Sequence, residues 1–448
     1  MKLLNRWWMA LLFLWVIWIL PPITHTIRRL CPTRPDGVNE AQAVSQFTRK
    51  YGISCTACHS SFPRLTPFAE RFKANGFQMP DTEDGDDTAD RSGDRLVMPQ
   101  LGNIFGARIA MNFAKVKTND IDKDGDGKKE TTSVTPGVVD WLQFFTAGSV
   151  YKNVSIFIET EINANTDDKV KNNWYYLGWH NILGKNGALS ARMGNIPQAD
   201  WHVMSGRLRM IPNIGISANG LKSSPGAASP DDQVSVSGAY PGFEFFGLPE
   251  ITKRVEGVYT FGLTSGKKTS VNPNPDLNYH GVLGLRAKDG DFDGSQISLF
   301  GKFGKDSDAT GGTRVGPYAY NSFYRLSPGV NLRWKGLDSI LAYYYGEDKN
   351  ATLSLTTPVK MVSRGLAGQI GYNISPAWWG GIQYDWAHVA DANATAAAID
   401  DHSISPTIWF FPRDNMRLGA VAKIDVQGEG TGHAQKQHEF LFHLRSMF

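Results

Sequence analysis

Three residues that are close together in the sequence can support redox chemistry. Cys55 and Cys58 are separated by two residues, and His59 follows directly. Two thiols at this spacing can each add to one vinyl group of a haem, and the adjacent histidine can bind the iron. The chain has three cysteines in 448 residues, so chance is a poor explanation for the motif. We therefore predict one covalently bound haem c, attached at Cys55 and Cys58, with His59 as the proximal ligand.

Two different interpretations of the cysteine pair require partners elsewhere in the chain. A zinc half-site needs a second pair of Cys or His residues at metal-binding spacing. A redox-active pair of the thioredoxin type needs a surrounding βαβ pattern. The sequence contains neither of these, and the haem remains the favoured prediction.

The residues after the motif predict a short helix that could cover one side of the haem. An apolar face with helical spacing is formed by Leu65, Phe68, Ala69 and Phe72. Thr66 can cap this helix, Pro67 suits its first position and Gly76 suits its end. The basic residues Arg64, Arg71 and Lys73 could pair with the haem propionates or form a solvated face.

The sixth iron ligand has several candidates. Met79 and Met98 are the nearest methionines that follow the motif. A His/Met pair would raise the reduction potential relative to a His/His pair. The sixth position could instead be open or be filled by a distant histidine, although His180, His202 and His388 are each predicted to be structural.

The first residues resemble a secretory signal, which we place at residues 1–26. Lys2 and Arg6 precede an apolar run from Trp7 to Leu20, which is short for a membrane span. Cleavage could occur as late as residue 43, and the alternative is an uncleaved N-terminal anchor. Export agrees with the haem prediction, because haem attachment of this kind takes place outside the cytoplasm.

The composition favours a membrane β-barrel. The net charge of +3 excludes a strongly basic nucleic-acid-binding protein. The chain is rich in aromatic residues and glycine, with 13 Trp, 15 Tyr, 24 Phe and 46 Gly. Its mean hydropathy is nevertheless −0.30. An apolar outer surface around a polar interior explains both properties.

From residue 100 onward, apolar and polar residues alternate as they do in strands. In 154–162, isoleucines share one face while Ser155, Glu159 and Glu161 share the other. The same alternation occurs in 415–425 and in the last strand, which ends at Phe448. Residues 100–448 are therefore predicted to form an antiparallel, porin-like outer-membrane barrel of about 16 strands. Residues 44–99 are predicted to form a short α-helical monohaem cytochrome c segment before it.

Turns and aromatic clusters complete the predicted barrel. Trp334-Lys335-Gly336 is one of several short stretches that suit a hairpin. The aromatic pairs Trp378-Trp379 and Trp409-Phe410 are predicted to lie in the girdles at the membrane surfaces.

A cation site is a further possibility between two predicted strands. Asp122, Asp124 and Asp126, followed by glycine, match the first half of a calcium loop. The twelfth position is Ser133, where a glutamate would be expected. These aspartates could instead capture iron or form an ordinary solvated surface loop.

The region around the motif resembles a known family, the outer-membrane fusions of a monohaem cytochrome c to a porin that oxidise Fe(II) in iron-oxidising bacteria. The resemblance covers Phe47 to Gly76 and includes Tyr51-Gly52, the Cys55–His59 motif and Phe62-Pro63. The barrel half agrees in architecture and length.

This resemblance implies that the protein lies in the bacterial outer membrane, in contact with lipid. It implies that extracellular Fe(II) is oxidised to Fe(III) and that single electrons pass through the haem to a periplasmic cytochrome or another carrier. Cys55, Cys58 and His59 match the family's haem-binding residues, and no catalytic residue is implied beyond the haem. Two further functions stay open: an electron conduit for another donor or acceptor, and a diffusion porin with a haem plug.

Overall fold

The computed structural model of the protein describes residues 46–61, 63–80, 104–119, 131–133, 138–162, 170–185, 187–205, 208, 210–211, 239–265, 277–306, 321–351, 358–391, 399–426 and 437–447. The predicted signal segment, Cys31, Met98, the three aspartates Asp122, Asp124 and Asp126, and Phe448 lie outside these residues.

One antiparallel sheet of 18 strands makes up most of the structure. Two of these strands, β4 (Thr131–Ser133) and β10 (Glu250–Thr252), have three residues each, which leaves sixteen longer strands. The sixteen are β3 (Phe105–Asn119), β5 (Val138–Tyr151), β6 (Val154–Ile162), β7 (Val170–Leu183), β8 (Leu189–Pro197), β9 (Ala239–Gly247), β11 (Val255–Ser265), β12 (Leu277–Ala287), β13 (Gln296–Asp306), β14 (Asn321–Trp334), β15 (Leu337–Asp348), β16 (Met361–Ser375), β17 (Trp378–Asp391), β18 (Ile399–Arg413), β19 (Met416–Asp425) and β20 (Gln437–Met447).

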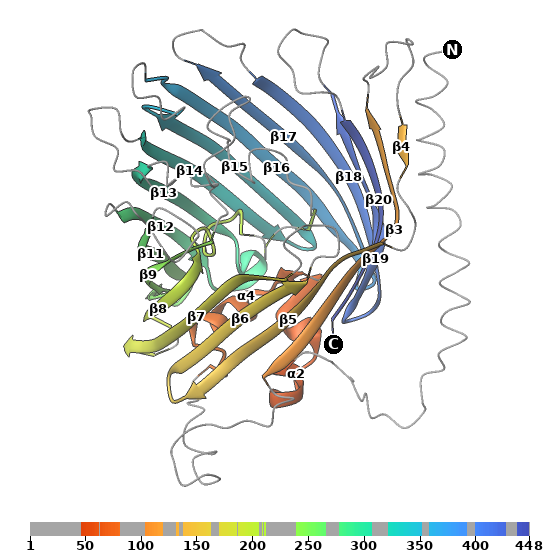
Figure 1. Ribbon diagram of the computed structural model, residues 1–448. Helices are drawn as coiled ribbons and strands as arrows, with labels where there is room; N and C mark the ends of the chain where they lie inside the picture. Colours follow the sequence, from red (N-terminus) through yellow and green to blue (C-terminus); the bar gives the residue numbers. More distant parts are fainter. Residues whose placement is uncertain are drawn as a thin grey trace, which may run out of the picture. The chain divides into compact units, whose positions relative to one another are not determined.

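The sheet closes on itself as a barrel (Figure 1). Each long strand pairs with the next, and β20 pairs with β3 to complete the ring. Closure pairs the backbone groups of neighbouring strands, which is required where water is absent. The predicted all-β barrel of about 16 strands is therefore confirmed.

The strands alternate between an apolar outer face and a polar inner face. On β6, Ile158 and Ile162 are exposed, whereas Ser155 and Glu159 are buried inside the barrel. Ile297, Leu283 and Ile370 on other strands also expose half or more of their surface. An exposed apolar belt of this kind is stable in lipid and not in water.

None of the helices in the described part of the chain has the length and hydropathy of a transmembrane helix.

The prediction that both residues of each aromatic pair lie in a girdle is wrong for Trp379 and Trp409. Trp379 and Trp409 have 0% exposure and face the lumen. Their neighbours Trp378 and Phe410 are directly paired across β17 and β18, with ring centroids 4.7 Å apart. The reason is the two-residue period of a strand, which sends adjacent side chains to opposite faces.

Tight turns join the strands at one end of the barrel. Trp334 and Leu337 are joined by the predicted turn, where Lys335 has φ of 45° and Gly336 has φ of 89°. Positive φ at both central residues matches the twist of antiparallel strands. The connections at the opposite end are longer, for example between β11 and β12 and between β13 and β14.

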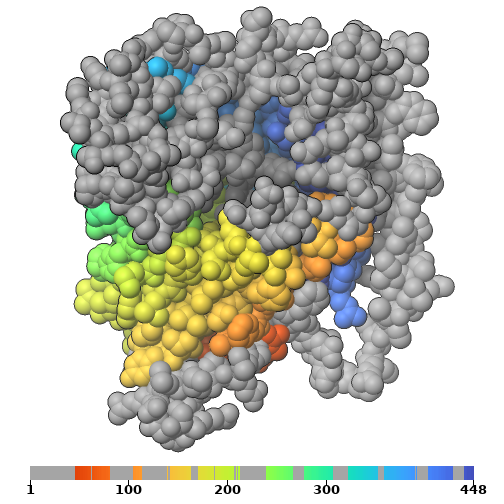
Figure 2. Space-filling view, viewed as in Figure 1, coloured from red at the N-terminus to blue at the C-terminus, as the bar shows by residue number. Residues whose placement is uncertain are grey.

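Two stretches of chain occupy the interior at the tight-turn end. The first is the CxxCH segment (residues 46–79), with α2 (Gln46–Tyr51), α3 (Cys55–Cys58), β1 (His59–Ser61), β2 (Arg64–Leu65) and α4 (Pro67–Ala74). Figure 1 shows α2 and α4 beside the ends of β5–β7, and Figure 2 shows part of this segment, in red, at the lower rim of the outer wall.

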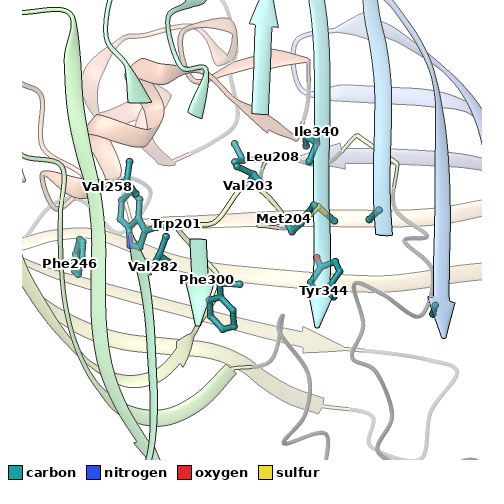
Figure 3. Close-up of a cluster of buried hydrophobic side chains, with 14 of the residues drawn as sticks. Trp201, Val203, Met204, Leu208, Phe246, Val258, Val282, Phe300, Ile340 and Tyr344 are labelled. Carbon is teal, nitrogen blue, oxygen red and sulfur yellow. The ribbon is translucent and has the colours of Figure 1, made fainter. Parts of the chain in front are cut away.

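The second stretch is the lumenal loop, the described residues of 198–211 that follow β8. Its side chains Trp201, Val203 and Met204 pack against strand residues such as Phe300 and Tyr344 (Figure 3). This cluster is an internal apolar core, and a second one contains Met210, Ile211, Trp379 and Trp409. The loop was not predicted from the sequence.

Candidate functional site

The two thiols of the motif lie on one helical turn. Helix α3 spans Cys55–Cys58, and the backbone N–H of His59 donates to the carbonyl of Cys55. Cys55 is buried, Cys58 is partly buried, and both are free thiols. A single turn brings residues i and i+3 to the same side, so the two thiols can attach to one group.

His59 is oriented by the turn that follows it. Its Nδ1 lies 3.1 Å from the carbonyl oxygen of Pro63. A metal-binding histidine commonly donates one ring N–H to a backbone carbonyl, which fixes the ring and leaves the other nitrogen for the metal. The donor set therefore fits a c-type haem, with two unoxidised thiols and an oriented imidazole directly after them.

Helix α4 holds the motif in place through its N-cap. The side chain of Thr66 accepts a hydrogen bond from the N–H of Ala69, as predicted. The same hydroxyl donates to the carbonyl of Ala57, and the N–H of Thr66 donates to the carbonyl of Cys58. The predicted helix is confirmed except that Leu65 lies in β2, where it pairs with His59.

An aromatic cluster covers the helices of the segment. The ring of Phe47 lies 5.2 Å from the rings of both Phe72 and Phe77, and Tyr51 lies 5.5 Å from Phe72. The hydroxyl of Tyr51 donates to the carbonyl of Phe77 at 2.7 Å. Phe72 and Phe77 are buried, and full burial of a phenylalanine ring contributes about 1.5–3 kcal/mol, so α2 and α4 form one packed unit.

Burial changes the protonation of the motif residues. It raises the pKa of the Cys55 thiol, and it raises the pKa of Cys58 to about 12, with a further contribution from Cys55. Burial also lowers the pKa of His59 to about 4, and the charge of Arg108 adds to this effect. Redox-active dithiols have lowered thiol pKa values, so these values argue against a thioredoxin-like pair.

The basic residues of the segment form ion pairs with carboxylates of the barrel and do not form a solvated face. Arg64 forms an ion pair with Asp338 on β15. Lys73 binds Asp200 in the lumenal loop at 2.5 Å, and Arg71 lies 3.3 Å from Glu256 on β11. We therefore do not assign these three cations to haem propionates.

A buried ionic network extends from α4 into the wall. Glu70 pairs with Arg286, which also binds Glu256 at 2.5 Å. Asp200 binds Arg192 at 2.8 Å, and Arg192 binds Glu244 at 2.8 Å. Removing one partner of a buried pair typically costs about 3–5 kcal/mol. The network therefore fixes the CxxCH segment firmly inside the barrel.

The segment also approaches the wall closely at two glycines. A Cβ on Gly76 would lie 2.5 Å from the ring of His180, and one on Gly187 would lie 2.7 Å from the Cβ of Ala74. His180 uses both ring nitrogens, on the carbonyl of Ala74 and the hydroxyl of Ser155. His180 is thus structural, as predicted, and is not available to bind iron.

The motif itself faces a different part of the wall from the ionic network. The charge of Arg108 on β3 acts on His59, and the charge of Asp414, in the turn between β18 and β19, acts on Cys55. Arg417 on β19 and Arg445 on β20 are direct neighbours across the ladder. The polar face of β19 was visible in the sequence, but the effect of Arg108 on His59 was not.

Of the remaining predicted site residues, Met79 is described and the others lie outside the described residues. Met79 follows α4, and its carbonyl accepts a hydrogen bond from the side chain of Asn75 at 3.1 Å. Met98 and the calcium-loop residues Asp122, Asp124 and Asp126 are not among the described residues. Within the described ranges, no three His, Cys, Asp or Glu side chains converge as metal ligands would.

Comparison with known proteins places the fold but gives no family. No protein-family model matches the sequence, and no curated protein is similar to it. The outer membrane channel DcaP of Acinetobacter baumannii has a TM-score of 0.50 and 12% identity, over 77% of this chain and 96% of that chain. OmpF of Salmonella typhi, in complex with daunomycin, has a TM-score of 0.49 and 11% identity, over 77% and 97%. OmpT of Vibrio cholerae has a TM-score of 0.49 and 10% identity, over 77% and 97%.

At these identities the likeness concerns the fold, which is that of a porin-like barrel. The apolar belt on the outer face of the strands supplies the independent physical argument for a membrane location. Together they identify the chain as a β-barrel of the bacterial outer membrane, with lipid as its surroundings.

Proposed function

We propose that the protein is an outer-membrane electron-transfer protein that carries one haem c at Cys55, Cys58 and His59. The observation that carries this proposal is the position of the motif, which lies inside a closed barrel on a segment held by buried ion pairs. A motif in this position can connect the two sides of the membrane electronically while the segment blocks free diffusion.

A haem c in this site supplies the reversible one-electron couple of its iron. Cys55 and Cys58 would tether it, and His59, oriented by the Pro63 carbonyl, would be an iron ligand. The rings of Phe47, Phe72 and Phe77 form an apolar cluster on the same segment of the chain. For the sixth position the candidates are still Met79, Met98, a distant histidine or an open site.

The strand connections support a direction for electron transfer. In outer-membrane barrels the short turns face the periplasm and the long loops face outward. The CxxCH segment lies at the short-turn end, within reach of a periplasmic cytochrome or another carrier. We propose extracellular Fe(II) as the substrate, which enters the lumen from the loop end and is oxidised to Fe(III) as one electron passes to the carrier.

Two further functions would use the same site. The porin-like fold favours a diffusion porin in which the segment is a plug. An electron conduit of a second kind keeps the haem but replaces Fe(II) by another donor or acceptor. The buried ion pairs favour a conduit over an open pore, because they hold the segment inside the lumen.

Mass spectrometry of the mature protein tests the haem directly. We expect the added mass of one haem, a visible spectrum of a c-type cytochrome, and rapid haem reduction on stopped-flow mixing with Fe(II). Cys58→Ala should lose one thioether, whereas Cys31→Ala, outside the motif, should leave the spectrum unchanged. A wild-type protein without bound haem would contradict the proposal.

Single-channel conductance separates the conduit from the porin. We expect the wild-type protein to show little ion conductance in a planar bilayer. A large steady conductance comparable to that of an open porin would favour the diffusion function instead.

A further inference from the structure

We propose that two neighbouring turns at the short-turn end of the barrel bind an anionic phospholipid of the periplasmic leaflet. The first turn follows β7 and the second follows β10. The exposed apolar and basic residues at these turns form what we call the amphipathic rim: Ile182, Leu183, Lys185, Ile251, Lys253 and Arg254. This inference rests on the membrane location of the barrel and does not depend on a haem.

The first argument is that the two turns are neighbours in space. Strands β8 and β9 pair with each other, and they lead out of the first turn and toward the second. The N–H of Leu248 donates to the carbonyl of Gly187 at 2.8 Å, and the hydroxyl of Tyr259 donates to the carbonyl of Ala188 at 2.8 Å. The two turns are therefore tied together, and their exposed side chains are parts of one surface.

The second argument is the apolar half of the amphipathic rim. Ile182, Leu183 and Ile251 are all exposed, Leu183 to 67%. They continue the apolar belt of the neighbouring strands, where Met193 on β8 and Phe245 on β9 are exposed as well. Exposed apolar residues that lie together mark a surface that contacts a membrane or a partner. The contact with lipid therefore extends along these strands to their short-turn end.

The third argument is the charge of the amphipathic rim. Lys185, Lys253 and Arg254 are exposed, and none of the three forms an ion pair within the described part of the chain. Glu250, the acidic residue of β10, is paired with Lys288. Cations beside exposed apolar side chains match a lipid that carries a negative phosphodiester on two acyl chains. An acidic soluble protein would neutralise the same charges but would not require the apolar side chains.

The experiment titrates the full-length protein, in an uncharged detergent, with phosphatidylglycerol and counts the bound lipid by native mass spectrometry. The rim variant combines Lys185→Gln with Lys253→Gln. The control variant combines Lys171→Gln with Lys349→Gln, because both of these lysines are exposed at the opposite, long-loop end of the barrel. Two further ligands are tested in parallel: phosphatidylcholine, which has no net charge, and glycerol phosphate, which has no acyl chains.

We expect the wild-type protein to bind phosphatidylglycerol more tightly than either of the other two ligands. The rim variant should bind phosphatidylglycerol about 25-fold more weakly, since each basic residue near an anionic surface contributes about fivefold. The control variant should match wild type. Leu183→Asn removes an apolar contact and keeps every charge, so it should also weaken phosphatidylglycerol binding but leave glycerol phosphate binding unchanged.

Four results overturn the inference. Equal affinity of the wild type for the two lipids would remove the role of the charges. Equal weakening in the rim and control variants would show an effect of net charge and not of a site. If glycerol phosphate binds as tightly as the lipid and is lost in the rim variant, the amphipathic rim binds free phosphate groups. If the rim variant binds phosphatidylglycerol as the wild type does, the cations are left for an acidic protein partner.

Discussion

His59 depends on its neighbours in the chain for its orientation and on the barrel for its burial. The carbonyl of Pro63 lies 3.1 Å from its Nδ1, within the hairpin of β1 and β2. The strands of the barrel bury the ring of His59 and place the charge of Arg108 near it. The local part of the site can therefore form before the segment enters the barrel.

We predict that His59→Ala separates tethering from iron binding. The two thioethers at Cys55 and Cys58 should remain, so the haem mass stays on the chain. The iron loses its proximal ligand, and the visible spectrum should change to that of a high-spin haem and recover when imidazole is added. His402→Ala is the matched control, because His402 bonds the hydroxyl of Tyr384, far from the motif in the sequence. An unchanged spectrum in His59→Ala would rule out His59 as the ligand.

The residue types of the motif were predictable from sequence, but the partners of the flanking cations were not. Arg64, Arg71 and Lys73 stand close to the motif in the chain and could be matched to propionates on that ground. Their partners Asp338, Glu256 and Asp200 lie more than a hundred residues away. Such pairs follow from strand register and loop path, which a single sequence does not specify.

At the scale of elements, the CxxCH segment behaves as a rigid insert with a close fit. Helix α4 ends at Ala74, and Gly76 turns the chain with φ of 72° against the ring of His180. The cap at Thr66, the proline at the first helical position and the glycine turn were all predictable, because they depend on local chemistry. The lumenal loop was not predictable, since its apolar residues carry no regular period.

We predict that Gly76→Ala loosens the insert more than Gly52→Ala. Both glycines have positive φ, 72° and 66°, so each substitution carries a backbone cost of about 1–2 kcal/mol. A Cβ at Gly52 meets nothing within 4 Å, whereas one at Gly76 lies 2.5 Å from His180. The added overlap should cost about 1–3 kcal/mol more. Hydrogen exchange of residues 46–79 measures the difference, and equal protection in both variants would argue against a close fit.

We predict that the lumenal loop loosens in acid because of His202. Burial lowers its pKa to about 4 from an ordinary value of 6.5. The unfolded loop therefore binds more protons than the packed one, so its stability falls as the pH drops from about 6.5 toward 4. The full loss is about 3 kcal/mol. Hydrogen exchange of residues 198–205 at pH 7 and pH 4.5 checks this, and His202→Phe, which keeps a ring beside Phe300, should remove the pH dependence.

At the scale of the whole molecule, the barrel was predictable from the sequence and the filling of its lumen was not. The alternation along β6, β19 and β20 was sufficient to predict a closed barrel of about the right size, because every strand must satisfy lipid on one side and a polar lumen on the other. The filling of the lumen depends on individual contacts such as Arg286 with Glu70. The general architecture was thus accessible from the sequence, whereas the seating of the motif required the structure.

The apolar belt gives a last prediction about the membrane itself. Leu283, in the middle of β12, is 71% exposed on the outer face. Leu283→Arg should cost about 2–4 kcal/mol if this position lies near the bilayer midplane. Ile251 in β10 is also exposed, at 57%, but it belongs to the short-turn rim, where Ile251→Arg should cost about 0–1 kcal/mol. Denaturant unfolding in lipid vesicles compares the two variants. If the two substitutions cost the same, lipid does not surround β12, because an exposed arginine would cost the same at both positions in water.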